Sequence, residues 1–244
     1  MEPTPRKFGV LFPPGNVTME RELPPLLPPE VSMHCNRLSR PDSSLSPASL
    51  AAMAQSVGRA ARDLAQTDPE IIVYGCTSGS FIGGEDEDEA IAAEIEQATG
   101  IPAVTTATAV RRALRALEVR SLYMVTPYPD ELNRAETVFL AFHGIEVIGC
   151  DTFGCQSSEE IRRISSDAVA DMVLRHADEI AGCDGVFISC TQLLSCDRIG
   201  TLEARLGKPV VSSNQASLWA ALDHMGVDAS GRGGGRLLDR LAGR

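Results

Sequence analysis

The hydrophobic and polar positions of this chain alternate between two kinds of segment. Short runs of β-branched and apolar residues, such as 71–73 and 186–188, predict buried strands. Each run is followed by a longer segment with helical spacing, and this alternation is typical of α/β proteins with parallel sheets. We predict strands near residues 7–12, 31–37, 70–75, 102–105, 120–126, 145–150, 184–189 and 209–212.

Helix signals lie between these runs. Ser46 and Pro47 have the residue types favoured at an N-cap and at the first helical position. The acidic run 85–89 falls at a helix start, where negative charge is favourable, and we interpret it as a solvated N-terminus and not as a metal site. We predict helices near residues 17–27, 47–66, 86–99, 107–117, 129–143, 158–181, 197–206 and 215–225.

The order of these elements repeats along the chain. The pair Cys76-Thr77 recurs as Cys190-Thr191, and the apolar run after Gly100 resembles the run after Gly207. Chance similarity of strand–turn–helix units is the alternative. We predict an α/β fold of two pseudo-symmetric, Rossmann-like parallel-sheet halves, with the active site in the cleft between them. The first half takes residues 1–106 and 214–244, and the second takes 107–213.

Composition excludes several classes of function. The net charge is −11 and no Lys/Arg-rich stretch offsets it, which argues against nucleic-acid binding. No apolar run reaches the roughly 20 residues that a membrane helix needs, and the N-terminus has no signal-peptide pattern, so we expect a cytoplasmic protein. Seven cysteines without repeated CxxC spacing, and four scattered histidines, argue against a disulfide framework, a zinc site and a Cys–His hydrolase.

Two of the cysteines carry the candidate chemistry. Cys76 and Cys190 each stand where a buried strand ends, so each thiol is expected to face the cleft. Backbone N–H groups and hydroxyls beside them can hold a carboxylate or enolate oxygen, or stabilise a thiolate. A lone cysteine at a strand end is more often a small buried hydrophobe. The matching positions in two halves instead indicate one substrate between two acid/base or nucleophilic sulfurs.

The loops after the first strand of each half supply two more candidates. Asn16 either orients a substrate carboxylate or caps the helix that follows. Tyr128 either donates a hydrogen bond to a substrate oxygen or packs at the surface. The remaining cysteines are interpreted as structural, with Cys196 the strongest exception because it follows the second thiol closely: Cys35, Cys150, Cys155, Cys183 and Cys196.

These residues resemble the aspartate/glutamate racemase superfamily, and within it the branch of arylmalonate decarboxylase and maleate cis–trans isomerase. The similarity runs over nearly the whole chain and is carried by residues 101–117, 125–128, 210–213 and 235–238. The resemblance implies two α/β halves with the site between them, and no cofactor or metal. The decarboxylases have Gly where Cys76 stands, whereas the isomerases and racemases keep both cysteines.

The resemblance therefore implies a two-cysteine reaction at Cys76 and Cys190. It implies that the substrate is held by side chains or backbone groups at six positions: Asn16, Thr77, Ser78, Tyr128, Thr191 and Gln192. The isomerases also carry a second substrate-binding Asn, which residues 156–162 of this chain lack. Whether Ser157 or Ser158 replaces it is open.

From these observations we predict a cofactor-independent isomerase of a small carboxylic acid, with conversion of maleate to fumarate through a Cys76 adduct as the leading reaction. The alternatives are a racemase of an α-substituted carboxylic acid or amino acid, a decarboxylase that uses Cys190 as proton donor, and a binding protein that has lost catalysis. The expected partner is a small carboxylate, without nucleic acid or membrane. A homodimer is one option for the oligomeric state.

Overall fold

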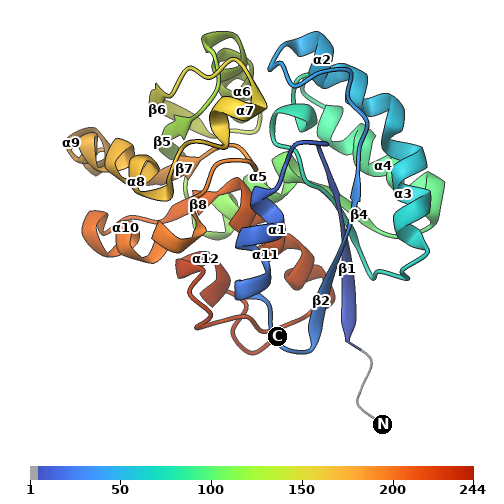
Figure 1. Ribbon diagram of the computed structural model, residues 1–244. Helices are drawn as coiled ribbons and strands as arrows, with labels where there is room; N and C mark the ends of the chain where they lie inside the picture. The colour runs from blue at the N-terminus through green and yellow to red at the C-terminus, as the bar shows by residue number, and fades with distance from the viewer. Residues whose placement is uncertain (1–4) are drawn as a thin grey trace.

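The computed structural model describes residues 5–244, and its strands form two four-stranded parallel sheets (Figure 1). All eight predicted strands are present. The first sheet has the order β2 (Val31–Arg37), β1 (Arg6–Phe12), β3 (Ile72–Tyr74) and β4 (Ala103–Thr105). The second has the order β6 (Glu146–Thr152), β5 (Ser121–Thr126), β7 (Gly185–Ile188) and β8 (Val210–Ser212).

The two sheets have the same topology. In each, the third strand in chain order pairs with the first and the fourth, and every pairing is parallel. This confirms the predicted α/β fold with two similar halves. The boundaries of those halves within the chain stay a prediction.

All helices except α12 (Gly235–Asp239), which was not predicted, follow the predicted positions, and three of the predicted helices are divided. The others are α1 (Thr18–Glu22), α2 (Pro47–Ala52), α3 (Val57–Ala65), α4 (Glu87–Thr99), α5 (Thr106–Ala116), α6 (Asp130–Phe142), α7 (Ser158–Ile161), α8 (Ser166–Arg175), α9 (Ala177–Ala181), α10 (Ile199–Leu206) and α11 (Ser213–Met225). Within residues 5–244, no helix is both long and apolar enough to cross a membrane.

The divided helices have local causes. The predicted helix 17–27 ends at Glu22, and a 3₁₀ turn over Pro24–Leu26 follows, because two consecutive prolines cannot donate helical hydrogen bonds. The predicted helix 158–181 is three helices: Ser165 accepts a hydrogen bond from Ala168 N and starts α8, and His176, with φ −106° and ψ 24°, separates α8 from α9. A 3₁₀ turn at Met53–Ser56 separates α2 from α3.

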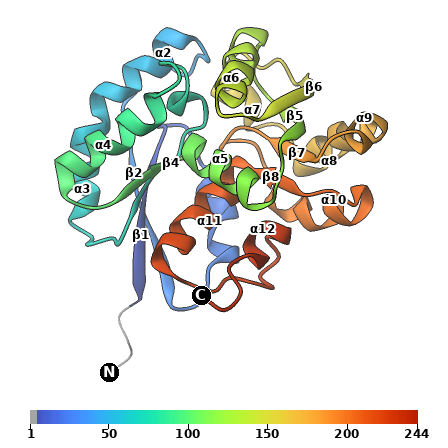
Figure 2. The same ribbon diagram turned by 180° about the vertical axis from the view of Figure 1, so that it is seen from behind.

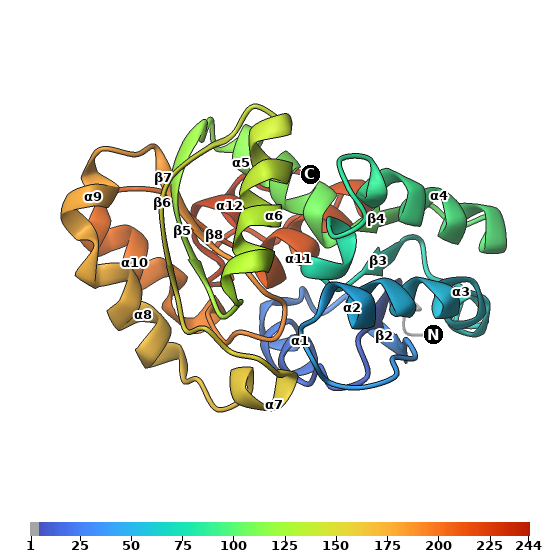
Figure 3. The ribbon, with the colours of Figure 1, turned by 90° about the horizontal axis from the view of Figure 1, so that it is seen from above.

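Helices α5 and α11 lie between the two sheets (Figures 2 and 3). Nearly every residue of α11 is buried, as expected of a helix that is covered on all sides. Strands β3 and β7 occupy interior positions in their sheets, so the residues that follow them are buried where the two halves meet.

Candidate active site

The first thiol lies directly after strand β3. Cys76 is 5% exposed, and its sulfur accepts a hydrogen bond from Gly79 N at 3.3 Å. This donor belongs to the 3₁₀ helix η3 (Ser78–Ser80). A Cβ atom at Gly79 would lie 3.1 Å from the sulfur, so a glycine lets the backbone approach the thiol closely.

The second thiol lies at the corresponding place after strand β7. Cys190 is 8% exposed, and its sulfur accepts a hydrogen bond from Gln192 N at 3.4 Å. Its φ angle is 99°, in the left-handed region that costs energy for a residue with a Cβ atom. Such strain is concentrated at functional sites, where the surrounding structure holds it in place.

Both thiols line one cavity of about 20 Å³. The structure thus brings together seven of the eight predicted site residues. Ser158 also lines the cavity, whereas the hydroxyl of Ser157 caps α7. The predicted residues in the lining are Cys76, Thr77, Ser78, Tyr128, Cys190, Thr191 and Gln192.

Asn16, the eighth predicted residue, is buried and does not line the cavity. Its Oδ1 accepts hydrogen bonds from Thr18 N and Met19 N, as in a helix cap. Its amide Nδ2 donates to Thr191 Oγ1 at 3.0 Å. The side chain therefore starts α1 and positions Thr191, which itself lines the cavity.

Ser213 joins the two thiol loops, and the sequence analysis missed it. Its Oγ accepts hydrogen bonds from Thr77 Oγ1 at 2.9 Å and from Cys190 N at 3.0 Å. Thr191 adds a second link, because its hydroxyl donates to Gly75 O at 3.1 Å. The repeat carried the signal, since the segment that ends at Ser213 resembles the segment that ends at Thr106.

Arg40, also missed, is the one charged side chain in the cavity lining among residues 5–244. It follows strand β2, whose carboxyl end shares the sheet edge with β3, and this shared edge was the available signal. Its Nε donates to Ser49 Oγ at 2.9 Å, and the guanidinium also donates to Ser44 O. These contacts hold a positive charge beside the first thiol.

The segments that carry Arg40 and Ser158 meet across the cavity. Leu45 N donates to Gln156 O at 3.1 Å, and Ser158 N donates to Ser43 O at 3.0 Å. These two backbone hydrogen bonds join segments that contribute Arg40, Leu45 and Ser158 to the cavity lining. A cavity of about 20 Å³ holds about one water molecule, so a substrate requires the lining residues to rearrange.

The two thiols differ in their electrostatic surroundings. Burial raises the pKa of Cys76, while the Gly79 N–H group and the Arg40 cation lower it. Burial raises the pKa of Cys190 to about 12; Tyr128 and Gln192 N lower it, and the negative charges of Cys76 and Glu136 raise it. Burial also holds the pKa of Tyr128 well above its usual range. At neutral pH, Cys190 is therefore a thiol and Tyr128 a neutral phenol.

The other side chains considered in the sequence for catalysis or metal binding do not line this cavity. Cys196 lines a separate cavity of about 420 Å³, and none of the four histidines lines the cavity of the two thiols. The acidic run 85–89 is not wholly solvated as expected, because Asp88 is fully buried and ion-paired with Arg111. Within residues 5–244, no group of three His, Cys, Asp or Glu side chains is arranged to hold a metal ion.

Comparison with known proteins identifies the family. The family model "Arylmalonate decarboxylase" matches residues 8–238. The chain belongs to the arylmalonate decarboxylase family. The arylmalonate decarboxylase of Bordetella bronchiseptica is 36% identical over 197 residues, which are 80% of this chain and 82% of that protein. A maleate isomerase of Nocardia farcinica is 29% identical over 243 residues, 96% of this chain and 95% of that protein.

Solved structures of both kinds of enzyme share the fold. The Nocardia farcinica maleate cis–trans isomerase bound to TRIS has a TM-score of 0.90 at 26% identity, covering 96% of this chain and 98% of its own. A variant of that isomerase, with the same scores, holds a covalently bound succinylcysteine intermediate. A liganded arylmalonate decarboxylase variant, with Gly replaced by Cys and Cys by Ser, has a TM-score of 0.83 at 31% identity, covering 97% of this chain and 100% of its own. The chain is therefore an enzyme of this family.

Proposed function

We propose that the protein is a cofactor-independent, two-cysteine isomerase of a small carboxylic acid, with conversion of maleate to fumarate as the leading reaction. One observation carries this proposal: Cys76 and Cys190 line the same cavity from opposite sheets. A one-thiol reaction would leave Cys76 without a role. The maleate isomerases match this chain over nearly its full length, which supports the same reaction class.

Cys76 is the proposed nucleophile, because Arg40 and the Gly79 N–H group favour its thiolate. The thiolate electron pair forms a C–S bond to one alkene carbon of maleate. The π electrons of the alkene move onto the adjacent carboxylate, which becomes an enediolate. The central C–C bond is now single and rotates.

Cys190 is the proposed proton donor and acceptor. As a thiol, it gives its proton to the α-carbon of the enediolate, which yields a succinyl adduct on Cys76. The Cys190 thiolate then takes the proton back, and the C–S bond breaks to release fumarate and the Cys76 thiolate. No proton or electron is gained or lost overall.

Donors around the cavity are positioned for the enediolate. Ser78 and Tyr128 line the cavity, and their hydroxyls are the proposed donors. The hydroxyls of Thr77 and Thr191, by contrast, already donate to Ser213 Oγ and Gly75 O. Such donors are already oriented before the reaction, and removal of one commonly costs about 3–4 kcal/mol in the transition state. Arg40 is the cation proposed to neutralise one substrate carboxylate.

Decarboxylation of a substituted malonate is the second candidate, and the 36% identity to an arylmalonate decarboxylase favours it. The substrate would lose CO₂ to leave an enediolate, which Cys190 would protonate. Cys76 would then be a spectator. Racemisation is the third candidate, in which the two thiols exchange one α-proton from opposite sides of a carbon acid.

One experiment separates these reactions. The purified protein, dialysed against EDTA, is incubated in D₂O with maleate, a substituted malonate or an amino acid, and each mixture is followed by NMR. Formation of fumarate without added cofactor supports the proposal. Loss of CO₂ from the malonate as the main activity contradicts it, and so does α-deuteration of an amino acid without fumarate formation.

A further inference from the structure

Four carboxylic acid side chains are buried within residues 5–244, and three of them are supplied with the donors that a carboxylate needs. Glu22 accepts hydrogen bonds from Ser195 N, Cys196 N and Asn214 Nδ2. Glu203 accepts two hydrogen bonds from backbone N–H groups, those of Val210 and Arg236. The oxygens of both buried carboxyls are thus supplied with hydrogen-bond donors.

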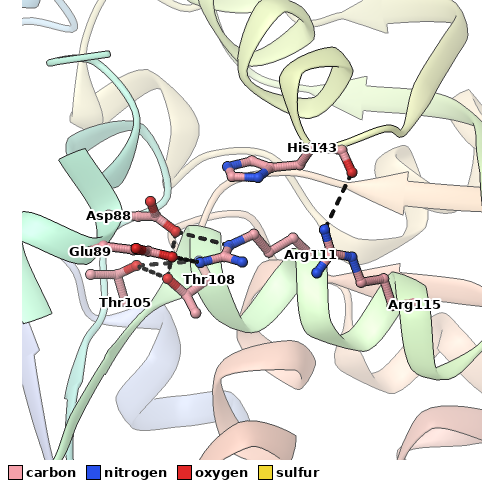
Figure 4. Close-up of polar contacts among 7 residues, drawn as sticks. All are labelled: Asp88, Glu89, Thr105, Thr108, Arg111, Arg115 and His143. Atoms are coloured by element: carbon pink, nitrogen blue, oxygen red, sulfur yellow. Dashed lines mark hydrogen bonds and ion pairs between the residues drawn. The ribbon is translucent and has the colours of Figure 1, made fainter. Parts of the chain in front are cut away.

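Asp88 forms an ion pair with Arg111. Its Oδ2 accepts hydrogen bonds from Thr108 Oγ1 at 2.5 Å and from Arg111 Nε at 3.1 Å (Figure 4). Arg111 also donates to Glu89, so the guanidinium lies between two carboxylates. Asp88 Oδ1 is buried without a hydrogen-bond partner, but the carboxylate lies beside the Arg111 cation.

Glu136 is the exception. It is 2% exposed, and within the described chain the only hydrogen bond of its side chain comes from Ser189 Oγ to Oε1 at 2.6 Å. Oε2 is buried without a partner, and Glu136 forms no ion pair with any residue in 5–244. The side chain belongs to the buried stripe of α6, which comprises Leu132, Asn133, Glu136, Phe139 and Leu140.

The single partner of Glu136 is the residue immediately before the second thiol. Ser189 is fully buried, and its backbone N–H donates to Val125 O. The next residue, Cys190, has the positive φ angle, so its conformation depends on what holds its neighbours. The contact at Ser189 is therefore one of the constraints on where the Cys190 sulfur lies.

We propose that Glu136 is a positioning residue that works as a neutral acid: it anchors the Cys190 turn through Ser189 and keeps negative charge away from the second thiol. The anchoring and the effect on charge are independent of the substrate, whereas the consequence for turnover rests on the proposed role of Cys190 as proton donor.

The charge of Glu136 changes near neutral pH. Burial raises its pKa to about 8, and the Ser189 hydroxyl opposes that rise. The titratable groups that face it are Tyr128 from the β5–α6 connection, Cys150 from β6 and Cys190 after β7, and a negative charge on Glu136 raises the pKa of all three. Above pH 8, the ionised acid therefore makes Cys190 a poorer proton donor.

The test compares Glu136→Gln with the unaltered protein, and uses Glu131→Gln, an exposed acid on the same helix, as the matched control. Each substitution is made in a Cys76→Ser background, and alkylation of the Cys190 peptide by iodoacetamide is followed by mass spectrometry from pH 7 to 10. We expect Glu136→Gln to increase the alkylation rate at the alkaline end at least about threefold, because the opposing charge is gone. Glu131→Gln is expected to leave the rate unchanged.

Thermal unfolding gives a second readout that needs no turnover. An acid whose pKa is raised on folding stabilises the protein most below its ordinary pKa, and this contribution is lost as pH rises through the folded value. The Tm of the unaltered protein should therefore fall more between pH 5 and 8 than that of Glu136→Gln. Equal alkylation profiles, or equal pH dependence of Tm, would overturn the proposal.

Turnover then shows the consequence for the reaction. We expect the alkaline limb of the kcat profile to lie at higher pH in Glu136→Gln, and we expect Glu136→Leu, which leaves the Ser189 hydroxyl unpaired, to lower kcat about tenfold at neutral pH. If no substrate turns over at all, the proposed function fails while the alkylation and Tm results still decide the role of Glu136.

Discussion

The Cys76 loop and the Cys190 loop have the same place in two sheets of the same topology, yet they offer opposite surroundings to their thiols. In each, a backbone N–H group two or three residues further along donates to the sulfur. The first loop adds the cation Arg40. The second adds a strained backbone, the Tyr128 hydroxyl and the buried acid Glu136.

This difference shows how a repeated scaffold can carry an asymmetric reaction. Parallel strands that end at the same edge bring two thiols to one cavity, and the repeat alone would make them equivalent. Residues outside the repeated pattern decide which thiol ionises more easily. In this protein burial raises the pKa of both thiols; Arg40 opposes that rise at Cys76, whereas Glu136 adds to it at Cys190.

Replacement of either thiol should have the largest effect on the rate of turnover. We expect Cys76→Ser and Cys190→Ser each to lower the rate of fumarate formation by at least about 10³-fold, because serine is a far weaker acid and its hydroxyl is not ionised. Initial rates measured by NMR check this. Cys196→Ser, which changes a thiol in the separate cavity, is the control. Undiminished turnover by Cys76→Ser would exclude the two-cysteine reaction.

Removal of the Arg40 cation should have the next largest effect on the rate of turnover. In Arg40→Met, the effect of burial on Cys76 is opposed only by hydrogen bonds from Gly79 N and Ser78, so the pKa of Cys76 rises further and the thiolate fraction at neutral pH falls. We expect kcat/KM at pH 7 to fall about tenfold or more, and the acid limb of the pH profile to move to higher pH.

Arg62→Met, at an exposed position on α3, controls for the loss of one surface charge from the same half. An acid limb that stays in place in Arg40→Met would contradict the assignment of Arg40 as the group that favours the Cys76 thiolate.

Much of the fold could be predicted from the sequence. All eight strands were recognised, most of them because a strand buried on both faces of a parallel sheet reads as a continuous apolar run; β2 and β6 are only partly buried. The helix breaks at Pro24 and Ser165 could have been recognised from their residue types, but the long apolar periodicity hid them. Helix α12 was not predicted, because its five residues are too few to show a period.

The candidate site was predictable only where the repeat marks it. The two thiol loops stand out because each occurs twice, and the structure brings them to one cavity. Arg40 lies in a connection without a counterpart in the repeat analysis, and Ser213 joins the loops through contacts distant in sequence. The sequence could have indicated Glu136, because an acid in the apolar stripe of a helix predicts a buried carboxyl.

Removal of the Ser213 hydroxyl, which links the two thiol loops, should have a smaller effect on turnover. Ser213→Ala leaves the Thr77 hydroxyl and the Cys190 N–H group buried without their acceptor. We expect the free energy of unfolding to fall by about 2 kcal/mol and kcat to fall with it, as measured by denaturant unfolding and by turnover. Ser230→Ala, in a surface turn, should leave both unchanged. A stability equal to the unaltered protein would show that Ser213 does not hold the loops together.

The most direct test of the assigned roles is to trap the adduct. The Cys190→Ser variant is incubated with maleate, digested and examined by mass spectrometry, with the double variant Cys76→Ser, Cys190→Ser as control. The proposed mechanism predicts one succinyl group on the peptide that contains Cys76 and none on the control. An unmodified Cys76 peptide, in a protein whose unaltered form converts maleate to fumarate, would contradict it.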